Sequence, residues 1–170
     1  MNTNKKIIVK LKSPKMKFSA GHFTIFSNES RENLHGHNFT VQCSIETLIE
    51  ENGMALDYNI YKHIIIDICN QLDEIILLPE KSPHMRLEES DTYYFCHFFD
   101  ERMVFLKRDV KFLPVANITI EELAFWMLSV LLSNIKNEYI RNINAIKIKI
   151  SSSPSQSAIA KWTKQKCLQP

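Results

Sequence analysis

Alternating apolar and polar positions predict three strands in the first third of the chain. Residues 7–19 alternate in this way, and Pro14 marks a bulge or an edge position within that strand. Residues 38–48 place apolar side chains on one face and polar side chains on the other, as expected for a half-buried strand. An Asn-Gly turn at 52–53 ends this strand and opens a short third strand through Leu56.

Two helices are predicted further along the chain. Asp57 is a suitable N-cap for a helix that runs to about Leu72, because apolar residues recur there every three or four positions. Thr119 and Glu122 form a capping-box pattern directly before an apolar run. The second helix is therefore predicted from Thr119 to about Asn137.

The remaining segments predict a loop, a hairpin and a final pair of strands. Residues 79–91 are rich in proline, serine and charge, which favours a loop. Aromatic and β-prone residues at 93–99 and 102–106 flank a short turn and predict a hairpin. Isoleucine alternates with lysine near the end of 145–150, and this strand is expected to pair with residues 158–162.

The order of elements is therefore strand, strand, helix, hairpin, helix, strand, strand. Strands joined by short turns pair antiparallel, and both helices are expected on one face of the sheet. The sequence predicts the α+β class, with an antiparallel sheet and two helices packed on one face. A chain of 170 residues is the usual size of one domain, so residues 1–170 are expected to form a single domain.

Composition excludes several classes of partner. Lysine and arginine number 21 against 19 acidic residues, and a net charge of +2 gives no field that would favour nucleic acid. Three glycines leave no phosphate-cradling glycine-rich loop. The N-terminus lacks the apolar run of a signal peptide, and no apolar stretch is long enough for a bilayer, so no membrane partner is expected. The four cysteines form no CxxC pair: Cys43, Cys69, Cys96 and Cys167. A cytoplasmic location therefore fits best.

Three of the six histidines are candidates for a metal site. His35 and His37 stand two apart, so in an extended segment they project to the same side, with Gly36 between them. If the first two strands are neighbours in the sheet, the end of the first lies beside the start of the second, and His22 can then join His35 and His37. Three neutral imidazoles with an open fourth position are a ligand set of catalytic zinc, which lowers the pKa of a bound substrate oxygen. The alternative is a turn with two solvated imidazoles and a hydrogen-bonded His22 at a strand end.

These histidines lie in segments that resemble a known family. FSAGHF at 18–23, followed by ENLHGHNF at 32–39, resembles the zinc motif of the 6-pyruvoyltetrahydropterin synthase family. The resemblance covers nearly the whole chain, from Lys17 to Trp162. Three more segments resemble family motifs in the same order: LDY at 56–58, QLD at 71–73 and NITIEELA at 117–124.

The resemblance implies a tunnelling fold, in which strands of several subunits form a barrel, and a homohexamer built as two stacked trimers. It also implies that Zn²⁺ is bound by His22, His35 and His37, and that a pterin substrate is held at a subunit boundary. Thr119 and Glu121, in the motif of the second helix, are expected substrate contacts.

The chain departs from most of the family at the catalytic cysteine. That cysteine is expected four to six positions before His35, where this chain has Glu29, Ser30 and Arg31. Glu32 instead resembles the glutamate of a subgroup known from malaria parasites and some bacteria. That subgroup is associated with cleaving 7,8-dihydroneopterin triphosphate to 6-hydroxymethyl-7,8-dihydropterin, a folate precursor. We expect the same zinc-dependent lyase reaction here, with 6-pyruvoyltetrahydropterin, a precursor in tetrahydrobiopterin biosynthesis, as an additional product.

Such a cleavage is a retro-aldol reaction, in which a base takes a proton from a side-chain hydroxyl while the pterin ring accepts the electrons. Glu32 is the expected base, with a pKa raised by partial burial. The family's Asp-His pair is Asp73-Glu74 in this chain, so Asp73 and Glu74 are the expected proton relay.

The last departure concerns the pterin ring. The family's ring-anchoring glutamate aligns with Ser152, which we expect at the substrate-binding wall. Losing a carboxylate that accepts two ring hydrogen bonds should weaken pterin binding, unless Glu121 or Glu122 replaces it. The alternative function is therefore a catalytically impaired oligomer that binds zinc and pterin.

Overall fold

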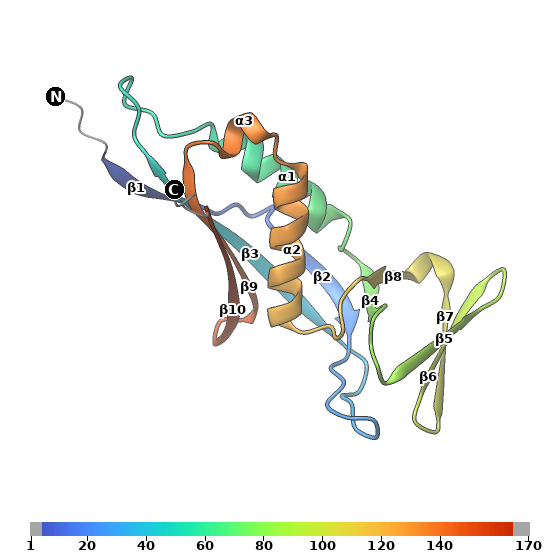
Figure 1. Cartoon of the computed structure of the whole chain (residues 1–170). Helices are drawn as coiled ribbons and strands as arrows, with labels where there is room; N and C mark the ends of the chain where they lie inside the picture. The colour runs from blue at the N-terminus through green and yellow to red at the C-terminus, as the bar shows by residue number, and fades with distance from the viewer. Residues whose placement is uncertain (1–4, 165–170) are drawn as a thin grey trace, which may run out of the picture.

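The main sheet is built around one long strand, β3 (His35–Leu48), in a computed structural model that describes residues 5–164 (Figure 1). β1 (Lys6–Leu11) and β2 (Lys17–His22) pair antiparallel with the same edge of β3, β2 with its first half and β1 with its second half. On the other edge, β9 (Ile143–Ser153) pairs antiparallel with β3, and β10 (Gln156–Thr163) pairs with β9. The predicted strand 7–19 is thus two strands.

The break between β1 and β2 falls around Pro14, the position that the sequence marks as a bulge or edge. The backbone of Met16 rejoins the sheet there, because its carbonyl accepts a hydrogen bond of 2.9 Å from the Val41 N–H. The predicted third strand through Leu56 is wrong. Both edges of β3 near Leu48 are already occupied by β1 and β9, and residues 49–57 form a loop with a turn at 51–53, in which Gly53 has a φ of +80°.

Two further strands extend the sheet beyond β2. β4 (Ile75–Pro79) pairs parallel with β2, and β8 (Val110–Leu113) pairs parallel with β4. Each is reached through a long crossover, which parallel pairing requires. The sheet is therefore mixed, and its antiparallel part comprises β1, β2, β3, β9 and β10. The α+β class is confirmed.

Both long helices cover one face of this sheet (Figure 1). α1 (Tyr58–Asn70) is capped by the Asp57 carboxylate, which accepts a hydrogen bond from the Asn59 N–H. α2 (Ile120–Asn134) is capped by Thr119, whose hydroxyl accepts from the Glu122 N–H. The chain turns out of α2 at Ile135 and forms a separate short α3 (Asn137–Ile140). None of the helices within residues 5–164 is long and apolar enough to span a bilayer.

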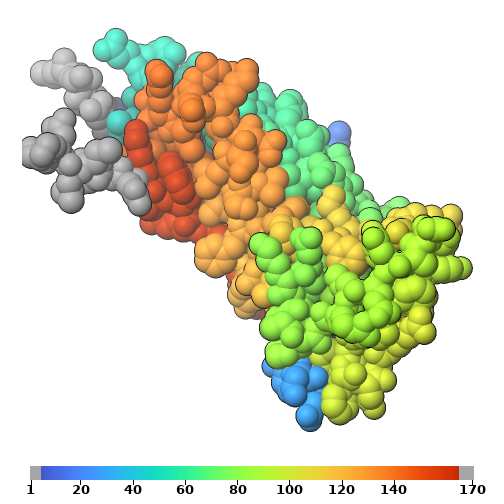
Figure 2. Space-filling view, turned by 45° about the vertical axis from the view of Figure 1, so that its right-hand side comes forward, coloured from blue at the N-terminus to red at the C-terminus, as the bar shows by residue number. Residues whose placement is uncertain are grey.

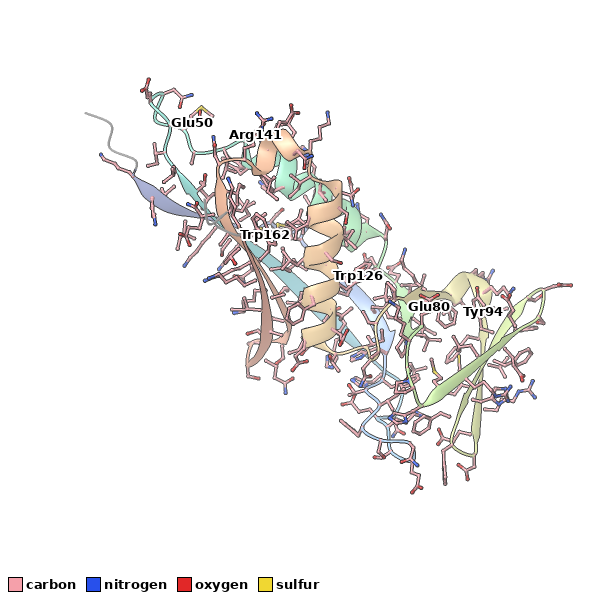
Figure 3. The ribbon with its side chains drawn as sticks, in the orientation of Figure 1. Glu50, Glu80, Tyr94, Trp126, Arg141 and Trp162 are labelled. Atoms are coloured by element: carbon pink, nitrogen blue, oxygen red, sulfur yellow. The ribbon has the colours of Figure 1, made fainter. Side chains whose placement is uncertain are left out.

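The main core lies between these helices and the sheet. Trp126 on α2 and Trp162 on β10 pack against it, as Figure 3 shows. Three cysteines are buried with free thiols, and Cys167 lies outside the described residues. The largest buried side chains of this core include Phe18, Phe39, Ile45, Tyr61, Ile65 and Leu72.

The segment between β4 and β8 forms a separate three-stranded sheet, which we call the insert. Its strands are β5 (Met85–Glu89), β6 (Tyr93–Phe98) and β7 (Glu101–Leu106), in that order. The predicted hairpin corresponds to β6 and β7, whereas β5 lies inside residues 79–91, which were wrongly predicted to be a loop throughout.

The insert has its own apolar cluster, and this cluster includes residues from the β2–β3 connector at 23–34. Phe23 and Ile25 of the connector pack with Cys96 and Phe98 of the insert. Figure 2 shows the connector in blue projecting beside the insert. The segment that carries Glu32 therefore rests on the insert.

Candidate metal centre and active site

The three candidate histidines come together through strand pairing. His22, the last residue of β2, is paired directly with His35, the first residue of β3, and Ala20 is paired with His37. Side chains alternate between the faces of a strand, so all three rings lie on the helix-covered face. One nitrogen from each ring lies within 4.8 Å of the others. His35 and His37 begin β3 rather than preceding it, and this extended geometry makes the two rings converge.

Backbone carbonyls fix the ring orientations of two of them. The Nδ1 of His22 lies 3.0 Å from the Ile118 carbonyl oxygen, and the Nδ1 of His35 lies 2.8 Å from that of Asn33. A carbonyl oxygen only accepts, so each Nδ1 carries the hydrogen and each Nε2 presents a lone pair. The Nε2 atoms of His35 and His37 are 3.1 Å apart.

The remaining nitrogen is buried without a partner. The Nε2 of His22 makes no hydrogen bond to any residue in 5–164, and the side chain is buried. Burial lowers the pKa of His22 and so favours the neutral ring. A buried nitrogen without a partner is costly, and a metal ion held by three Nε2 atoms would satisfy it. These donors fit a three-histidine metal site with a fourth position left for a substrate or water.

Residues before α2 hold both the metal site and the connector. Ile118 provides the carbonyl that orients His22. The Asn117 side chain accepts from the N–H groups of Ile118 (3.0 Å) and Ile25 (3.1 Å) and donates to the Ile25 carbonyl (2.7 Å). The sequence motif at 117–124 contained this asparagine, but its link to Ile25 is a contact 92 positions away that spacing alone cannot show.

Glu32 is held beside the histidines by the backbone of Thr24. Its N–H donates to the Thr24 carbonyl at 2.9 Å, and its Oε2 accepts from the Thr24 N–H at 2.9 Å. The same Oε2 lies 4.0 Å from the His35 Nε2. Burial raises the pKa of Glu32, but the Thr24 hydrogen bonds and the nearby His35 outweigh it, so the pKa lies below its ordinary value. The expected raised pKa is therefore wrong.

The histidines and Glu32 line a cavity of about 490 Å³. Thr119, Glu121 and Ser152, the predicted substrate contacts, line the same cavity from α2 and β9. Their roles stay predictions. Phe39 and Ile120, which lie in the quoted motifs, also line the cavity. The sequence did not single out the remaining lining residues: Thr24, Ser155, Gln156 and Ser157.

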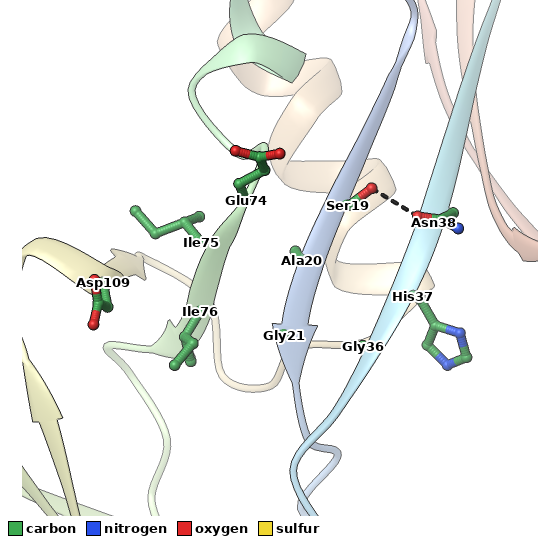
Figure 4. A pocket seen from close by; sticks show the side chains of 10 residues that line it. All are labelled: Ser19, Ala20, Gly21, Gly36, His37, Asn38, Glu74, Ile75, Ile76 and Asp109. Carbon is green, nitrogen blue, oxygen red and sulfur yellow. Dashed lines mark hydrogen bonds between the residues drawn. The ribbon is translucent and has the colours of Figure 1, made fainter.

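Asp73 and Glu74 do not line this cavity. The Asp73 Oδ1 accepts a hydrogen bond of 2.6 Å from the Ser19 N–H, and the Glu74 N–H donates to the Ser19 carbonyl at 2.7 Å. Glu74 lines a second cavity of about 500 Å³. This cavity lies mainly on the face of β2 and β3 opposite to the one that carries the histidine rings, because successive side chains of a strand point to opposite faces. Figure 4 shows the His37 ring pointing away from Glu74.

A family model described as 6-pyruvoyl tetrahydropterin synthase matches residues 13–162. The chain belongs to this family. The 6-pyruvoyl tetrahydropterin synthase of Plasmodium falciparum is 29% identical, has a TM-score of 0.89, and the match covers 95% of this chain and 100% of that chain.

Two further relatives have similar lengths. The 6-pyruvoyl tetrahydropterin synthase of Plasmodium vivax is 28% identical with a TM-score of 0.89, over 94% of this chain and 99% of that chain. It was also solved with a glutamate, named as a catalytic residue, replaced by alanine. A protein of Methanocaldococcus jannaschii, with a provisional assignment as a 6-carboxy-5,6,7,8-tetrahydropterin synthase, is 27% identical over 84% of this chain and 88% of its own length.

The two glutamates of the connector, Glu29 and Glu32, lie in different surroundings. Glu29 lies exposed in the turn at its tip, where its N–H donates to the Ser27 hydroxyl. Arg31 points back toward the insert, and its guanidinium bonds Glu101. Of the two connector glutamates, only Glu32 lines the histidine cavity.

Proposed function

We propose that this chain is a zinc-dependent pterin lyase that cleaves the side chain of 7,8-dihydroneopterin triphosphate to 6-hydroxymethyl-7,8-dihydropterin. One observation carries the proposal. The Glu32 carboxylate lies 4.0 Å from the His35 Nε2, inside the cavity where three imidazole nitrogens converge. A carboxylate beside a three-histidine site places a base next to a position where a metal-bound hydroxyl can sit.

His22, His35 and His37 would hold the metal. Bound zinc would lower the pKa of the substrate's side-chain hydroxyls and fix their position. The Ile118 and Asn33 carbonyls keep the His22 and His35 rings aimed at the centre.

Glu32 acts as the base in this proposal. It takes the proton of the second side-chain hydroxyl, and the bond between the first and second side-chain carbons breaks. The second carbon leaves as an aldehyde that carries the triphosphate. The electron pair moves into the dihydropterin ring, and the first carbon then takes up a proton to give the hydroxymethyl product. With its pKa below the ordinary value, Glu32 is ionised near neutral pH, which is the form that accepts a proton.

The connector favours this reaction over that of the 6-carboxytetrahydropterin synthases. The positions of the expected cysteine hold Glu29, Ser30 and Arg31, and within residues 5–164 no cysteine lines the cavity. The P. vivax relative, in which a glutamate is named as a catalytic residue, supports a glutamate in the same role here. We assign that role to Glu32 and keep 6-pyruvoyltetrahydropterin as an additional product.

Asp73 and Glu74 would act from a second copy of the chain. Neither residue lines the histidine cavity, and Glu74 faces the second cavity on the other side of the sheet, so a part in the reaction at the histidines requires a neighbouring subunit. We therefore propose a homohexamer of two trimers, with the substrate at a subunit boundary. Sizing in solution should give about six times 19.9 kDa, and a stable monomer would contradict this arrangement.

A second candidate function is supported by the uncharged residues that line one side of the histidine cavity. Ser152 stands where a ring-anchoring glutamate is expected, and Ser155, Gln156 and Ser157 beside it add no charge. Glu121 is then the carboxylate left to accept the ring N–H groups from that side. The alternative is an oligomer that binds zinc and pterin with little turnover.

Incubation of purified, zinc-loaded protein with 7,8-dihydroneopterin triphosphate separates the two. The lyase should release 6-hydroxymethyl-7,8-dihydropterin, which is detected by fluorescence after oxidation and chromatography, and Glu32→Gln should release it far more slowly. Binding of the substrate without product, together with stoichiometric zinc, would support the impaired oligomer. Protein without stoichiometric zinc would contradict both.

A further inference from the structure

Arg31, next to Glu32, contacts both the connector and the insert through its backbone and its side chain. It pairs with Ile25 in an isolated antiparallel bridge, so the two arms of the connector meet there. Its side chain is only 15% exposed. Its Nη1 donates a hydrogen bond of 2.7 Å to the carbonyl oxygen of Glu32.

The rest of the guanidinium binds the insert. Its Nε donates to the Glu101 Oε2 at 2.7 Å, and its Nη2 bonds the same oxygen. The guanidinium carbon lies 5.1 Å from the centre of the Phe23 ring and 5.8 Å from that of Phe98, within reach of a cation–π interaction. One planar group therefore joins the connector at Phe23 and Glu32 to the insert at Phe98 and Glu101.

We propose that Arg31 is a positioning residue for Glu32, and that the β5–β7 insert holds the connector in its catalytic geometry through Glu101. The inference rests on the proposed function for the role of Glu32. Side-chain direction at Glu32 depends on its backbone, and the backbone is fixed on one side by Thr24 and on the other by the Arg31 guanidinium. A displacement of about 1 Å at a catalytic group can cost about 100-fold in rate.

The contacts separate this role from an ordinary surface ion pair. Exposed Arg–Glu pairs contribute little, because solvent screens them. The Arg86–Glu88 pair on β5 is of that kind, with side chains 65% and 47% exposed. Glu101 is 49% exposed, but the Arg31 side chain is only 15% exposed and packs against two rings. Its planar fork also bonds two acceptors at once, which a lysine cannot reproduce.

The first experiment measures steady-state kinetics with 7,8-dihydroneopterin triphosphate. Arg31→Lys should lower kcat by about 10- to 100-fold with little change in KM or zinc content, because only the geometry of Glu32 changes. Glu101→Gln, at an exposed residue that can be replaced without unfolding, should lower kcat in the same direction by a smaller factor. Arg86→Gln, the matched control on the same insert, should leave kcat unchanged. Wild-type kcat in both Arg31→Lys and Glu101→Gln would overturn the proposal.

The second experiment asks whether Arg31 acts through Glu32. In a Glu32→Gln background the base is absent, so Arg31→Lys should cause no further loss of the residual rate. An equal loss in both backgrounds would mean that Arg31 merely supports the fold, and would overturn the proposal.

A third measurement is independent of activity. Hydrogen exchange of the peptide over residues 23–34 should be faster in Arg31→Lys and Glu101→Gln than in wild type and Arg86→Gln, with β3 and β9 unchanged. Unchanged exchange would overturn the anchoring by Arg31. If wild type releases no product but exchange responds as expected, the proposed function fails while the anchoring stands.

Discussion

His22 and His35 are directly opposite each other in the pairing of β2 with β3, with ring centroids 4.7 Å apart. The register of the sheet therefore sets their separation, and the connector between them does not. Sites built on strands keep their geometry better than sites built on loops. The metal site should accordingly tolerate changes in the connector that would displace Glu32.

The metal site can be tested by removing one ligand. Zinc analysis after dialysis should find one ion per chain in wild type and none in His35→Ala, because a site with two remaining imidazoles binds zinc far more weakly. His97→Ala is the matched control, since His97 lies on the insert and contacts Glu88. Equal zinc content in His35→Ala and wild type would show that the metal is bound elsewhere.

The assignment of the base rests on two glutamates of the same connector. Glu32→Gln should retain zinc and bind pterin, but reduce the rate by roughly 100-fold or more, the usual scale for losing a positioned base. Glu29→Gln should be active, since Glu29 lies exposed at the connector tip. If the effects are reversed, the wrong carboxylate has been chosen. If neither substitution matters in an active enzyme, Asp73 or Glu74 performs the proton transfer.

Restoring a carboxylate at residue 152 should strengthen pterin binding. Hydrogen bonds to a charged acceptor contribute roughly 1.5–3 kcal/mol, so Ser152→Glu should lower the dissociation constant of a dihydropterin by about 10- to 100-fold. Calorimetric titration measures this directly. Ser153→Glu is the control, because the next residue of a strand points to the other face. Equal affinity in wild type and Ser152→Glu would mean that Ser152 does not face the ring.

The buried thiols predict a loss of stability at alkaline pH. Burial raises the pKa of Cys43 and Cys69 to about 12 and that of Cys96 to about 11, above the ordinary value of 9.0. Above about pH 9 these thiols ionise only in the unfolded chain, so the free energy of unfolding falls as pH rises toward 11.

Cys69→Ala isolates one of these contributions. Its free energy of unfolding, measured by urea denaturation under reducing conditions, should fall less steeply than that of wild type, by up to about 1.4 kcal/mol per pH unit above pH 9. Equal slopes between pH 9 and 11 would contradict a protonated, buried Cys69.

The elements predicted best were those in which apolar and polar residues alternate because one face is buried. The alternation of 38–48 and 145–150 correctly located β3 and β9, although β3 begins earlier, at His35, and β9 extends further in both directions, from Ile143 to Ser153. β4 was missed because it lies inside the sheet, and its short apolar run does not alternate. β5 was missed because its charged residues face solvent on the small insert sheet.

The candidate site shows the same division. His35 and His37 were recognised because their convergence follows from local spacing. The face occupied by Glu74 was not predictable, because a shift of one residue along a strand moves a side chain to the other side of the sheet. The direction of the Glu32 pKa was missed for a similar reason, since the Thr24 hydrogen bonds exist only once the connector folds back on itself.

The separation of Glu32 and Glu74 by the thickness of one sheet has a genetic consequence. In the proposed hexamer, each reaction centre takes Glu32 from one chain and Glu74 from another. A chain with Glu32→Gln and a chain with Glu74→Gln would each be defective alone, yet a mixed assembly would contain some centres with both glutamates intact. Two defective alleles of this protein would then complement each other when expressed together.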